Sequence, residues 1–307
     1  MIHKRLFRNA LLLHCSFIPS RSIHAMATSA PVTPVIDRAI FNQTLYDQMR
    51  DFWFQGVPDN ATSGSFEALQ RWFAIGRSKQ EKEAFDEECR TRFGPALEAI
   101  SPSKLALPPW KSYEDELQHA ETLAAPLLAQ VKEAQREDAE KGAKTLLSQI
   151  LLLDQMPRNT MRDQAGLKLV YSHYDRLAFS LLRSSMRLSP HPFDAKLWRG
   201  APVYLTWALL PLMHSEHLPS HDLYTQRMAA CRKECEATGD EAAIGYIDRS
   251  TKFEADHVIL IERFGRYPHR NQCQGRQNTA EEEVYLKTAD TFGVENNHKE
   301  EVGRSEL

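Results

Sequence analysis

Several features that mark other protein classes are scarce or missing in this chain of 307 residues. Its apolar runs fall short of the roughly 18 uncharged residues that a membrane-spanning helix needs, so we expect no membrane span. No P-loop, dinucleotide fingerprint, nucleophile elbow or zinc motif is present, so the sequence indicates no cofactor and no metal. The five cysteines are an odd number and are scattered, which favours free thiols in a reducing compartment over a disulfide framework.

A charge surplus of either sign is also absent. The 38 basic and 41 acidic residues nearly cancel and leave a formal net charge of −3. Nucleic-acid-binding domains usually carry a marked basic surplus, so we expect no nucleic-acid partner. With 42% apolar and 26% charged residues, the composition is that of an ordinary globular protein.

Acidic residues are missing from the first 36 positions, and the first one is Asp37. Basic residues there are interleaved with leucine and phenylalanine and followed by serine-rich sequence, which is typical of a mitochondrial presequence. A start at Met26 would instead give a cytoplasmic protein. A secretory signal fits less well, because His14 and Cys15 interrupt a short apolar core. Each alternative assigns residues 1–36 to targeting or to a disordered N-terminus outside the fold.

Helical periodicity dominates after Asp37, with frequent apolar residues at i, i+3, i+4 and i+7 and little strict alternation. We therefore predict an all-α single domain over residues 37–292, followed by a polar tail over residues 293–307. Paired helices joined by short turns favour an irregular α-α superhelix similar to tetratricopeptide (TPR-like) proteins.

Proline and glycine predict where helices end, and charge predicts which ones lie outside. The pattern indicates one stop at Gly94-Pro95 and another at Pro157. The stretch from Tyr113 to Lys141 is heavily charged and has a narrow apolar stripe, so we expect it on the surface. The segment APVYLTWALLPLMHSE is apolar almost all round, so we expect a central helix there.

Asp154 follows three leucines on the buried face of a predicted helix, close to the C-terminus of that helix. A carboxylate in this position is disfavoured by desolvation and by the negative end of the helix dipole, so a cation must compensate it. Arg158 is one candidate, and the arginines near residue 270 are others. Asp154 belongs either to a structural ion pair or to a functional site, and the two roles are not exclusive.

The segment ERFGRYPHRNQCQGR, residues 262–276, concentrates cations in a chain of almost balanced charge. Gly265 ends one helix and Pro268 begins a new element, which places the following residues at its first turn. Backbone N–H groups and guanidinium groups there suit a phosphate or a carboxylate. The alternative is internal pairing with acids, but the arginines exceed the acids available. The candidates are Arg263, Arg266, His269, Arg270, Asn271 and Arg276.

The segment LMHSEHLPSHD gathers histidines and acids in a way that suggests a metal site. A proline interrupts the helix that its paired histidines would need, and His214 and Glu216 point to different sides of a continuing helix. We therefore expect no metal and interpret His214 and Glu216 as hydrogen-bonding groups at the end of a buried helix. His257 lies in an apolar stripe and is either a core histidine or, because its helix leads to the arginine cluster, a ligand-binding residue.

Five segments carry a family resemblance: DFWF, FDEECRTRFG, ILLLDQMPRN, LPLMHSE and IERFGRYPHRNQCQGRQNTAEE. In this order they resemble DUF924, a family of unassigned function, from about Ile40 to Phe292. The resemblance implies an all-α, TPR-like fold and no particular activity. A charged helical insertion at about residues 111–142 departs from the bacterial pattern, and we expect it to be peripheral. The family positions correspond to Asp154, Arg158, Asn159, His214, Glu216, His257, Arg263, His269, Arg270, Asn271 and Arg276.

These polar residues come from separate helices, as the residues of a pocket do, so we expect a cleft that binds a small anionic ligand. In the enzymatic version, His214 or His269 is the general acid or base and Asp154 or Glu216 orients it. The alternative is an interaction scaffold that binds a peptide partner, with the motif residues acting as structural fasteners. A ligand site requires these side chains to meet around a cavity. The candidate ligand-binding residues are Arg158, Asn159, His257, Arg263, Arg266, Arg270, Asn271 and Arg276.

Overall fold

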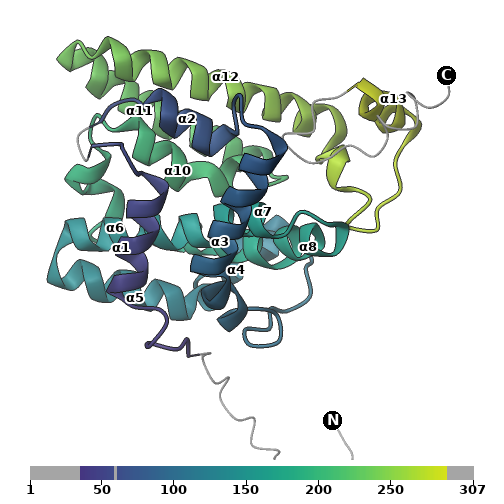
Figure 1. Cartoon of the computed structure of the whole chain (residues 1–307), viewed down its shortest axis with the longest axis horizontal. Helices are drawn as coiled ribbons and strands as arrows, with labels where there is room; N and C mark the ends of the chain where they lie inside the picture. The colour runs from purple at the N-terminus through teal and green to yellow at the C-terminus, as the bar shows by residue number, and fades with distance from the viewer. Residues whose placement is uncertain (1–34, 59–60, 289–307) are drawn as a thin grey trace, which may run out of the picture. The chain divides into compact units, whose positions relative to one another are not determined.

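The computed structural model describes residues 35–58 and 61–288. These residues are helical and contain no β-strand, which confirms the predicted all-α class (Figure 1). They belong to one compact unit. Within them, no helix is long and apolar enough to cross a membrane. The predicted targeting segment, apart from Val35 and Ile36, and the predicted polar tail lie outside the described residues.

The helices follow one another with short connections. The first six are α1 (Gln43–Trp53), α2 (Phe66–Phe73), α3 (Lys79–Ala99), α4 (Tyr113–Leu123), α5 (Ala125–Glu137) and α6 (Ala139–Ile150). Next come η1 (Leu151–Gln155), α7 (Met156–Thr160), α8 (Gln164–Leu169), η2 (Val170–Tyr174) and α9 (Asp175–Ser185). The last are η3 (Pro192–Asp194), η4 (Lys196–Trp198), α10 (Pro202–Met213), α11 (Leu218–Thr238), α12 (Glu241–Phe264), η5 (Pro268–Arg270) and α13 (Ala280–Thr288). Here η1 and η2 are π-helical turns, and η3, η4 and η5 are 3₁₀ turns.

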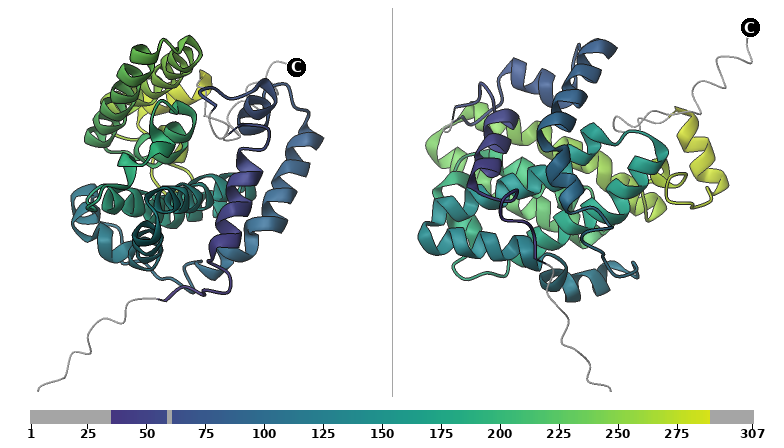
Figure 2. Two further views of the ribbon diagram at one scale, coloured as in Figure 1. Left: turned by 90° about the vertical axis from the view of Figure 1, so that its left-hand side faces the viewer. Right: turned by 60° about the horizontal axis from the view of Figure 1, so that its bottom comes forward.

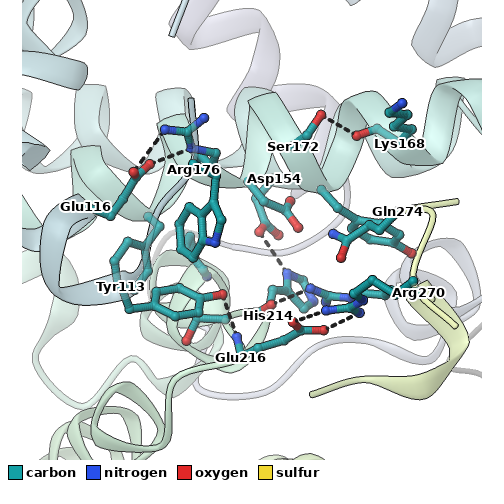
Figure 3. Close-up of a pocket in the computed structure, with 17 residues that line it drawn as sticks. Tyr113, Glu116, Asp154, Lys168, Ser172, Arg176, His214, Glu216, Arg270 and Gln274 are labelled. Atoms are coloured by element: carbon teal, nitrogen blue, oxygen red, sulfur yellow. Dashed lines mark hydrogen bonds and ion pairs between the residues drawn. The ribbon is translucent and has the colours of Figure 1, made fainter. Parts of the chain in front are cut away.

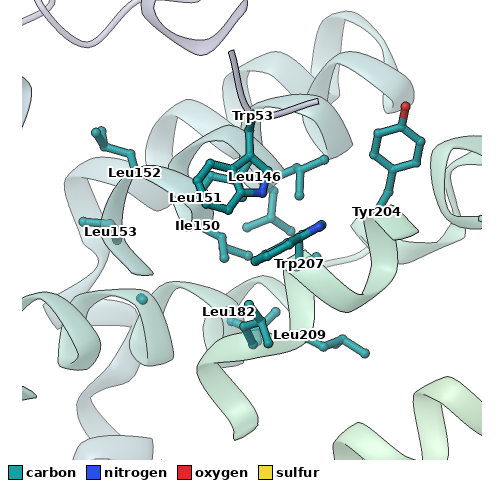
Figure 4. Packing of buried hydrophobic residues seen from close by; sticks show 14 of the residues in the cluster. Trp53, Leu146, Ile150, Leu151, Leu152, Leu153, Leu182, Tyr204, Trp207 and Leu209 are labelled. Atoms are coloured by element: carbon teal, nitrogen blue, oxygen red, sulfur yellow. The ribbon is translucent and has the colours of Figure 1, made fainter. Parts of the chain in front are cut away.

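Helix α10 lies at the centre, as the sequence predicts, and every one of its residues is buried. It packs against the α11–α12 pair on one side and against α6 and α9 on the other (Figures 1 and 2). Trp207 from α10 meets Trp53 from α1 edge to face, with ring centroids 4.9 Å apart. Leu146 and Ile150 of α6 lie in the same apolar cluster (Figure 4). The core therefore fixes the end of α10, from which His214 and Glu216 extend.

Two predicted helix ends are wrong, and packing explains both. Helix α3 continues through Gly94 and Pro95 to Ala99, because Phe93 and Leu97 are buried and tertiary contacts outweigh the local breakers. The helical path also continues past Pro157 to Thr160. There the Met156 N–H donates to the Leu151 carbonyl in a wide π turn. Pro157, which has no N–H to donate, follows directly after this turn.

The charged stretch from Tyr113 to Lys141 is not confined to the surface. It forms α4, α5 and the start of α6, and Leu127 and Val131 of α5 are fully buried against the core. The polar side chain of Glu116 is buried as well, because Arg176 of α9 neutralises it. The expected peripheral position of this stretch is therefore wrong, since its narrow apolar stripe and its buried ion pair both face the interior.

Gly265 ends α12, as predicted. Its φ is +68°, in the left-handed region that glycine adopts without strain, and its N–H donates to the Ile261 carbonyl. The chain then reverses through η5. Thr279 and Glu282 form reciprocal hydrogen bonds at the start of α13. The segment between α12 and α13 is thus fixed at both ends, and it carries Arg270 and Arg276 back to the end of α10.

Candidate functional site

Two π-helical turns shape one side of the site. In η1 the Met156 N–H donates to the Leu151 carbonyl, and in η2 the Asp175 N–H donates to the Val170 carbonyl, each spanning five residues. The two turns contact each other. A π turn holds one more residue than an α-helical turn and redirects the side chains in it, which is why such turns are common at functional sites. Here η1 presents Asp154, and η2 presents Tyr171.

Asp154 and His214 form a hydrogen-bonded pair inside the protein. His214 Nδ1 lies 2.8 Å from Asp154 Oδ1, and Gln155 donates to Oδ2 at 2.6 Å. The Asp154 carboxylate is almost fully buried. Burial opposes its ionisation, but the attraction to His214 in its protonated form and to Arg158 outweighs burial and holds the pKa of Asp154 at about 2.

His214 is held in one orientation by this pair. Burial, and then the charge of Arg158, lower the pKa of His214 below its ordinary value despite the opposing effect of Asp154. The pair is therefore an ionised carboxylate beside a neutral imidazole. An ionised carboxylate only accepts hydrogen bonds, so Nδ1 carries the hydrogen and Nε2 keeps a lone pair. Within the described residues, Nε2 has no hydrogen-bond partner.

Arg158 compensates Asp154 but pairs more closely with another acid. Its two terminal nitrogens donate to the two carboxylate oxygens of Asp175 at 2.7 and 2.9 Å. Its Nη1 lies 3.6 Å from Asp154 Oδ1 and donates to the Asp154 carbonyl at 2.6 Å. Arg158 therefore fastens η1 to the start of α9. Its positive charge also stabilises the nearby carboxylate of Asp154.

Glu216 and Arg276 form a second fastening pair. Arg276 Nη1 donates to Oε2 at 2.6 Å and Nη2 donates to Oε1 at 2.9 Å, and the Tyr267 N–H also donates to Oε1. Burial raises the pKa of Glu216, but the hydrogen bond from Arg276 and the charges of Arg270 and Arg276 outweigh it, so the net shift is downward. The ionised pair attaches the segment after α12 to the end of α10.

Arg270 differs from these arginines because no carboxylate in the described part of the chain pairs with it. Only 6% of the residue is exposed. Its guanidinium carbon lies 4.4 Å from the ring centres of both Tyr171 and Tyr267, and Nη1 donates to the His214 carbonyl at 2.8 Å. Among the described residues, no carboxylate lies within 4.0 Å of Arg270 and no acceptor bonds its Nε. The charge of this buried cation is therefore unmatched by any close anion of residues 35–58 and 61–288.

A cavity of about 340 Å³ opens beside these groups (Figure 3). Asp154, His214, Glu216, Arg270 and Arg276 all line it, so five of the predicted residues meet around one open volume. Because α10 ends at Met213, His214 and Glu216 are free to face the same space instead of opposite sides of a helix. These five side chains from separate parts of the chain therefore border one open volume.

The other predicted residues lie outside the cavity wall. Arg263 pairs with Glu281 at the surface, and Arg266 makes a two-bond pair with the carboxylate of Glu282. The Asn159 side chain donates to the Gln155 carbonyl. His257, His269 and Asn271 do not line the cavity. The expected cradle of backbone N–H groups after Pro268 is not formed, because η5 is a single 3₁₀ turn in which the N–H groups of Arg270 and Asn271 donate to carbonyls of the same turn.

Sequence reasoning missed much of the cavity wall. Trp110, Tyr113 and Phe179 form an aromatic side, and Tyr171, Asp175 and Gln274 lie closer to Arg270. Tyr113 belongs to the charged stretch that the sequence places on the surface. One available signal was the last polar motif, in which Gln274 lies between Arg270 and Arg276. The aromatic residues carried no local signal, because ring contacts between distant helices leave no spacing pattern.

Comparisons with known proteins place the chain in a family but supply no activity. Residues 49–290 match the family described as bacterial protein of unknown function (DUF924). A solved structure of a protein of unknown function from Agrobacterium tumefaciens is 24% identical, and the match covers 82% of this chain and 100% of that one with a TM-score of 0.47. No curated protein matches the chain.

Proposed function

We propose that this chain, which belongs to the DUF924 family of proteins of unknown function, binds a small organic anion in the cavity beside Arg270. The observation that carries the proposal is the state of Arg270, a buried guanidinium that lines an open cavity and has no carboxylate partner among the described residues. Burying a charge without a partner is costly, and a buried charged group in a cleft is therefore a candidate for a functional site.

The surroundings of Arg270 keep it charged. Burial alone would lower its pKa, but Tyr171 and the more distant carboxylates of Asp175 and Glu216 outweigh burial and raise the pKa of Arg270. Those carboxylates are themselves bonded to Arg158 and Arg276. Their charge is therefore largely neutralised, and a ligand anion would meet a guanidinium that lines the cavity without a close carboxylate.

His214 gives the same cavity a proton-transfer group. It lines the cavity, its Nδ1 is held by Asp154, and its Nε2 has no partner in the described part of the chain. A lowered pKa keeps the imidazole neutral near pH 7, so Nε2 can accept a proton there. We therefore propose that His214 is the general base for a ligand held at Arg270, with Asp154 as its positioning residue.

Structural fastening accounts for three of the predicted arginines. Arg158, Arg266 and Arg276 each make two bonds to one carboxylate, which joins separate helices. The fastening role that we considered for the whole set therefore applies to these three. It does not account for Arg270, which has no such partner in the described chain.

Binding is tested with purified full-length chain and defined anions. We expect acetate, pyruvate, benzoate or inorganic phosphate to raise the melting temperature, because an anion at about 100 times its Kd stabilises the folded state by about 2.7 kcal/mol. Arg270→Gln should abolish the shift, and Arg270→Lys should keep part of it. Arg263→Gln is the matched control, because it removes a surface arginine paired with Glu281, and should leave the shift intact. A wild-type protein that no anion stabilises or binds in calorimetry would overturn the proposal.

A further inference from the structure

We infer that the occupant of this cavity is a small carboxylate attached to a planar ring, with its carboxylate at Arg270 and its ring against Trp110, Tyr113 and Phe179. The inference rests on the proposed function, since it assumes that Arg270 binds an anion. It goes further by specifying both the charge of the ligand and the chemistry of its uncharged part.

The charges around the cavity select an anion and exclude an amine. Each carboxylate in the wall already has an arginine partner: Glu116 has Arg176, Glu216 has Arg276, and Asp175 and Asp154 share Arg158. An ammonium group would find no unpaired carboxylate in the described wall. The cations in the wall without a carboxylate partner among the described residues are Arg270, which is buried, and Lys168, which is exposed.

The donors at Arg270 fit a carboxylate. The residue supplies one buried positive charge, and the fork of a guanidinium matches the two oxygens of a carboxylate. The side-chain amide of Gln274 also lines the cavity and has no hydrogen-bond partner in the described residues. Within the described wall, no second unpaired buried arginine is present to neutralise a phosphate dianion, because Arg176 and Arg276 pair with Glu116 and Glu216. One buried cation and one amide are therefore matched best by a singly charged acid.

The opposite end of the cavity is aromatic. Trp110 and Tyr113 meet at 4.7 Å between ring centres, and Tyr113 and Phe179 meet at 5.4 Å. Figure 3 shows Tyr113 and Arg176 at one end of the cavity and Arg270 and Gln274 at the other, with His214 between them. A planar ring gains both apolar burial and favourable ring-to-ring geometry against such a wall. A ligand that reaches both ends would pass directly beside His214.

Tyr113 adds a hydrogen-bond donor at the aromatic end. Its oxygen accepts a hydrogen bond from the Glu216 N–H at 2.6 Å, and its hydroxyl hydrogen has no acceptor among the described residues. Burial raises the pKa of Tyr113, so the hydroxyl keeps its proton at neutral pH. The hydroxyl can therefore donate to a polar atom of the ligand near the ring. A ligand with an unsubstituted ring would leave this donor unused.

The volume of the cavity indicates the size of the ligand. The cavity of about 340 Å³ is roughly twice the volume of about 150 Å³ that holds one benzene ring in an engineered protein cavity. It therefore has room for one six-membered ring with a short acid side chain. Larger fused-ring acids would extend past Trp110, which is 44% exposed and stands at the edge of the cavity.

The test compares matched probes by isothermal titration calorimetry on the full-length chain. Phenylacetate should bind at least tenfold more tightly than propionate, which has the same charge and no ring. Phenylacetamide, which has the ring and no charge, should bind at least tenfold more weakly than phenylacetate, and phenylphosphonate should not exceed phenylacetate. Trp110→Ala should weaken phenylacetate severalfold and leave propionate unchanged. Phe66→Ala removes another exposed aromatic side chain, outside the cavity wall, and should change neither.

The outcomes separate this inference from the proposed function. If propionate and phenylacetate bind equally and both require Arg270, the ring is not recognised; the inference then fails while anion binding stands. If phenylphosphonate binds more tightly than phenylacetate, the carboxylate assignment fails. If no acid binds, the proposed function and the inference fail together. Because Trp110 is half exposed, its replacement tests recognition with little risk to folding.

Discussion

At the scale of single residues, Asp154 and His214 show how a buried carboxylate is stabilised and how it orients a neighbouring imidazole. A buried carboxylate in a helical segment is unfavourable by itself. Here a hydrogen bond from Gln155, the charge of Arg158 and the imidazole of His214 all stabilise it. In return, Asp154 determines which nitrogen of His214 carries the hydrogen, and thereby which nitrogen keeps a basic lone pair.

Asp154→Asn tests this control of the imidazole. An asparagine amide can donate to Nδ1, so we expect the hydrogen of neutral His214 to shift from Nδ1 toward Nε2, which would remove the basic lone pair from the cavity. The tautomer is measured by NMR of ¹⁵N-labelled histidine at pH 7.5. The exposed His119 serves as an internal reference that should not change. An unchanged His214 tautomer would show that Asp154 does not set it.

At the scale of elements, the site depends on where helices stop or widen. Wide turns in η1 and η2 present Asp154 and Tyr171, and the end of α12 at Gly265 lets the chain return with Arg270. None of these positions belongs to the regular part of a long helix. The regular helices supply the core, and the irregular segments between them carry Asp154, Tyr171 and Arg270.

Gly265→Ala tests the importance of that helix end. Gly265 has φ +68° and no atom lies within 4 Å of the position that an alanine Cβ would take, so the expected cost is backbone strain alone, about 1 kcal/mol of the free energy of unfolding. Gly94→Ala is the matched control. Gly94 lies inside α3, where a Cβ would make an ordinary contact with Arg90 at 3.8 Å, so alanine should stabilise by about 0.5–1 kcal/mol. Urea denaturation measures both. Equal effects of the two substitutions would contradict the conformational explanation.

The helix ends also mark the limits of sequence reasoning. Gly265 was predictable because the requirement for positive φ is local, and α10 was predictable because it is apolar on all sides. The ends at Gly94-Pro95 and Pro157 were mispredicted because burial and a wide turn offset the local breakers. In the cavity wall, Asp154, His214, Glu216, Arg270 and Arg276 come from the polar motifs, whereas the other motif residues lie outside it. The partners Asp175 and Tyr171 were not predicted, because a tertiary contact between distant helices leaves no periodic signal.

At the scale of the whole molecule, buried histidines make stability depend on pH. Burial lowers the pKa of His257 to about 3 and that of His269 well below its ordinary value. Burial also lowers the pKa of His173, His191, His214 and His217. In the unfolded chain these imidazoles take up protons below about pH 6.5. The unfolded chain then binds more protons than the folded one, so stability falls as the pH is lowered.

We therefore expect the free energy of unfolding to fall between pH 6.5 and pH 5, before the paired carboxylates begin to protonate. A histidine that stays neutral in the folded chain costs about 1.4 kcal/mol per pH unit once the unfolded chain is fully protonated there. His257 and His269 together should then cost about 2–3 kcal/mol between pH 6 and pH 5. Glu254, whose pKa burial raises, acts in the opposite direction. Urea denaturation at several pH values measures the slope. His257→Gln should reduce it, His119→Gln should not, and a flat profile would refute the assignment.

The contacts of Arg270 with two tyrosine rings have a thermodynamic consequence for recognition. A free arginine side chain loses up to about 2 kcal/mol of rotamer entropy when it is immobilised. In this protein, folding has already immobilised the guanidinium against Tyr171 and Tyr267 and through its bond to the His214 carbonyl. A ligand that binds there would not have to order that side chain and would avoid this entropy cost of about 2 kcal/mol. At about 1.4 kcal/mol per factor of ten, the avoided cost corresponds to roughly thirtyfold in affinity. A ligand too small to fill the cavity can therefore still bind measurably.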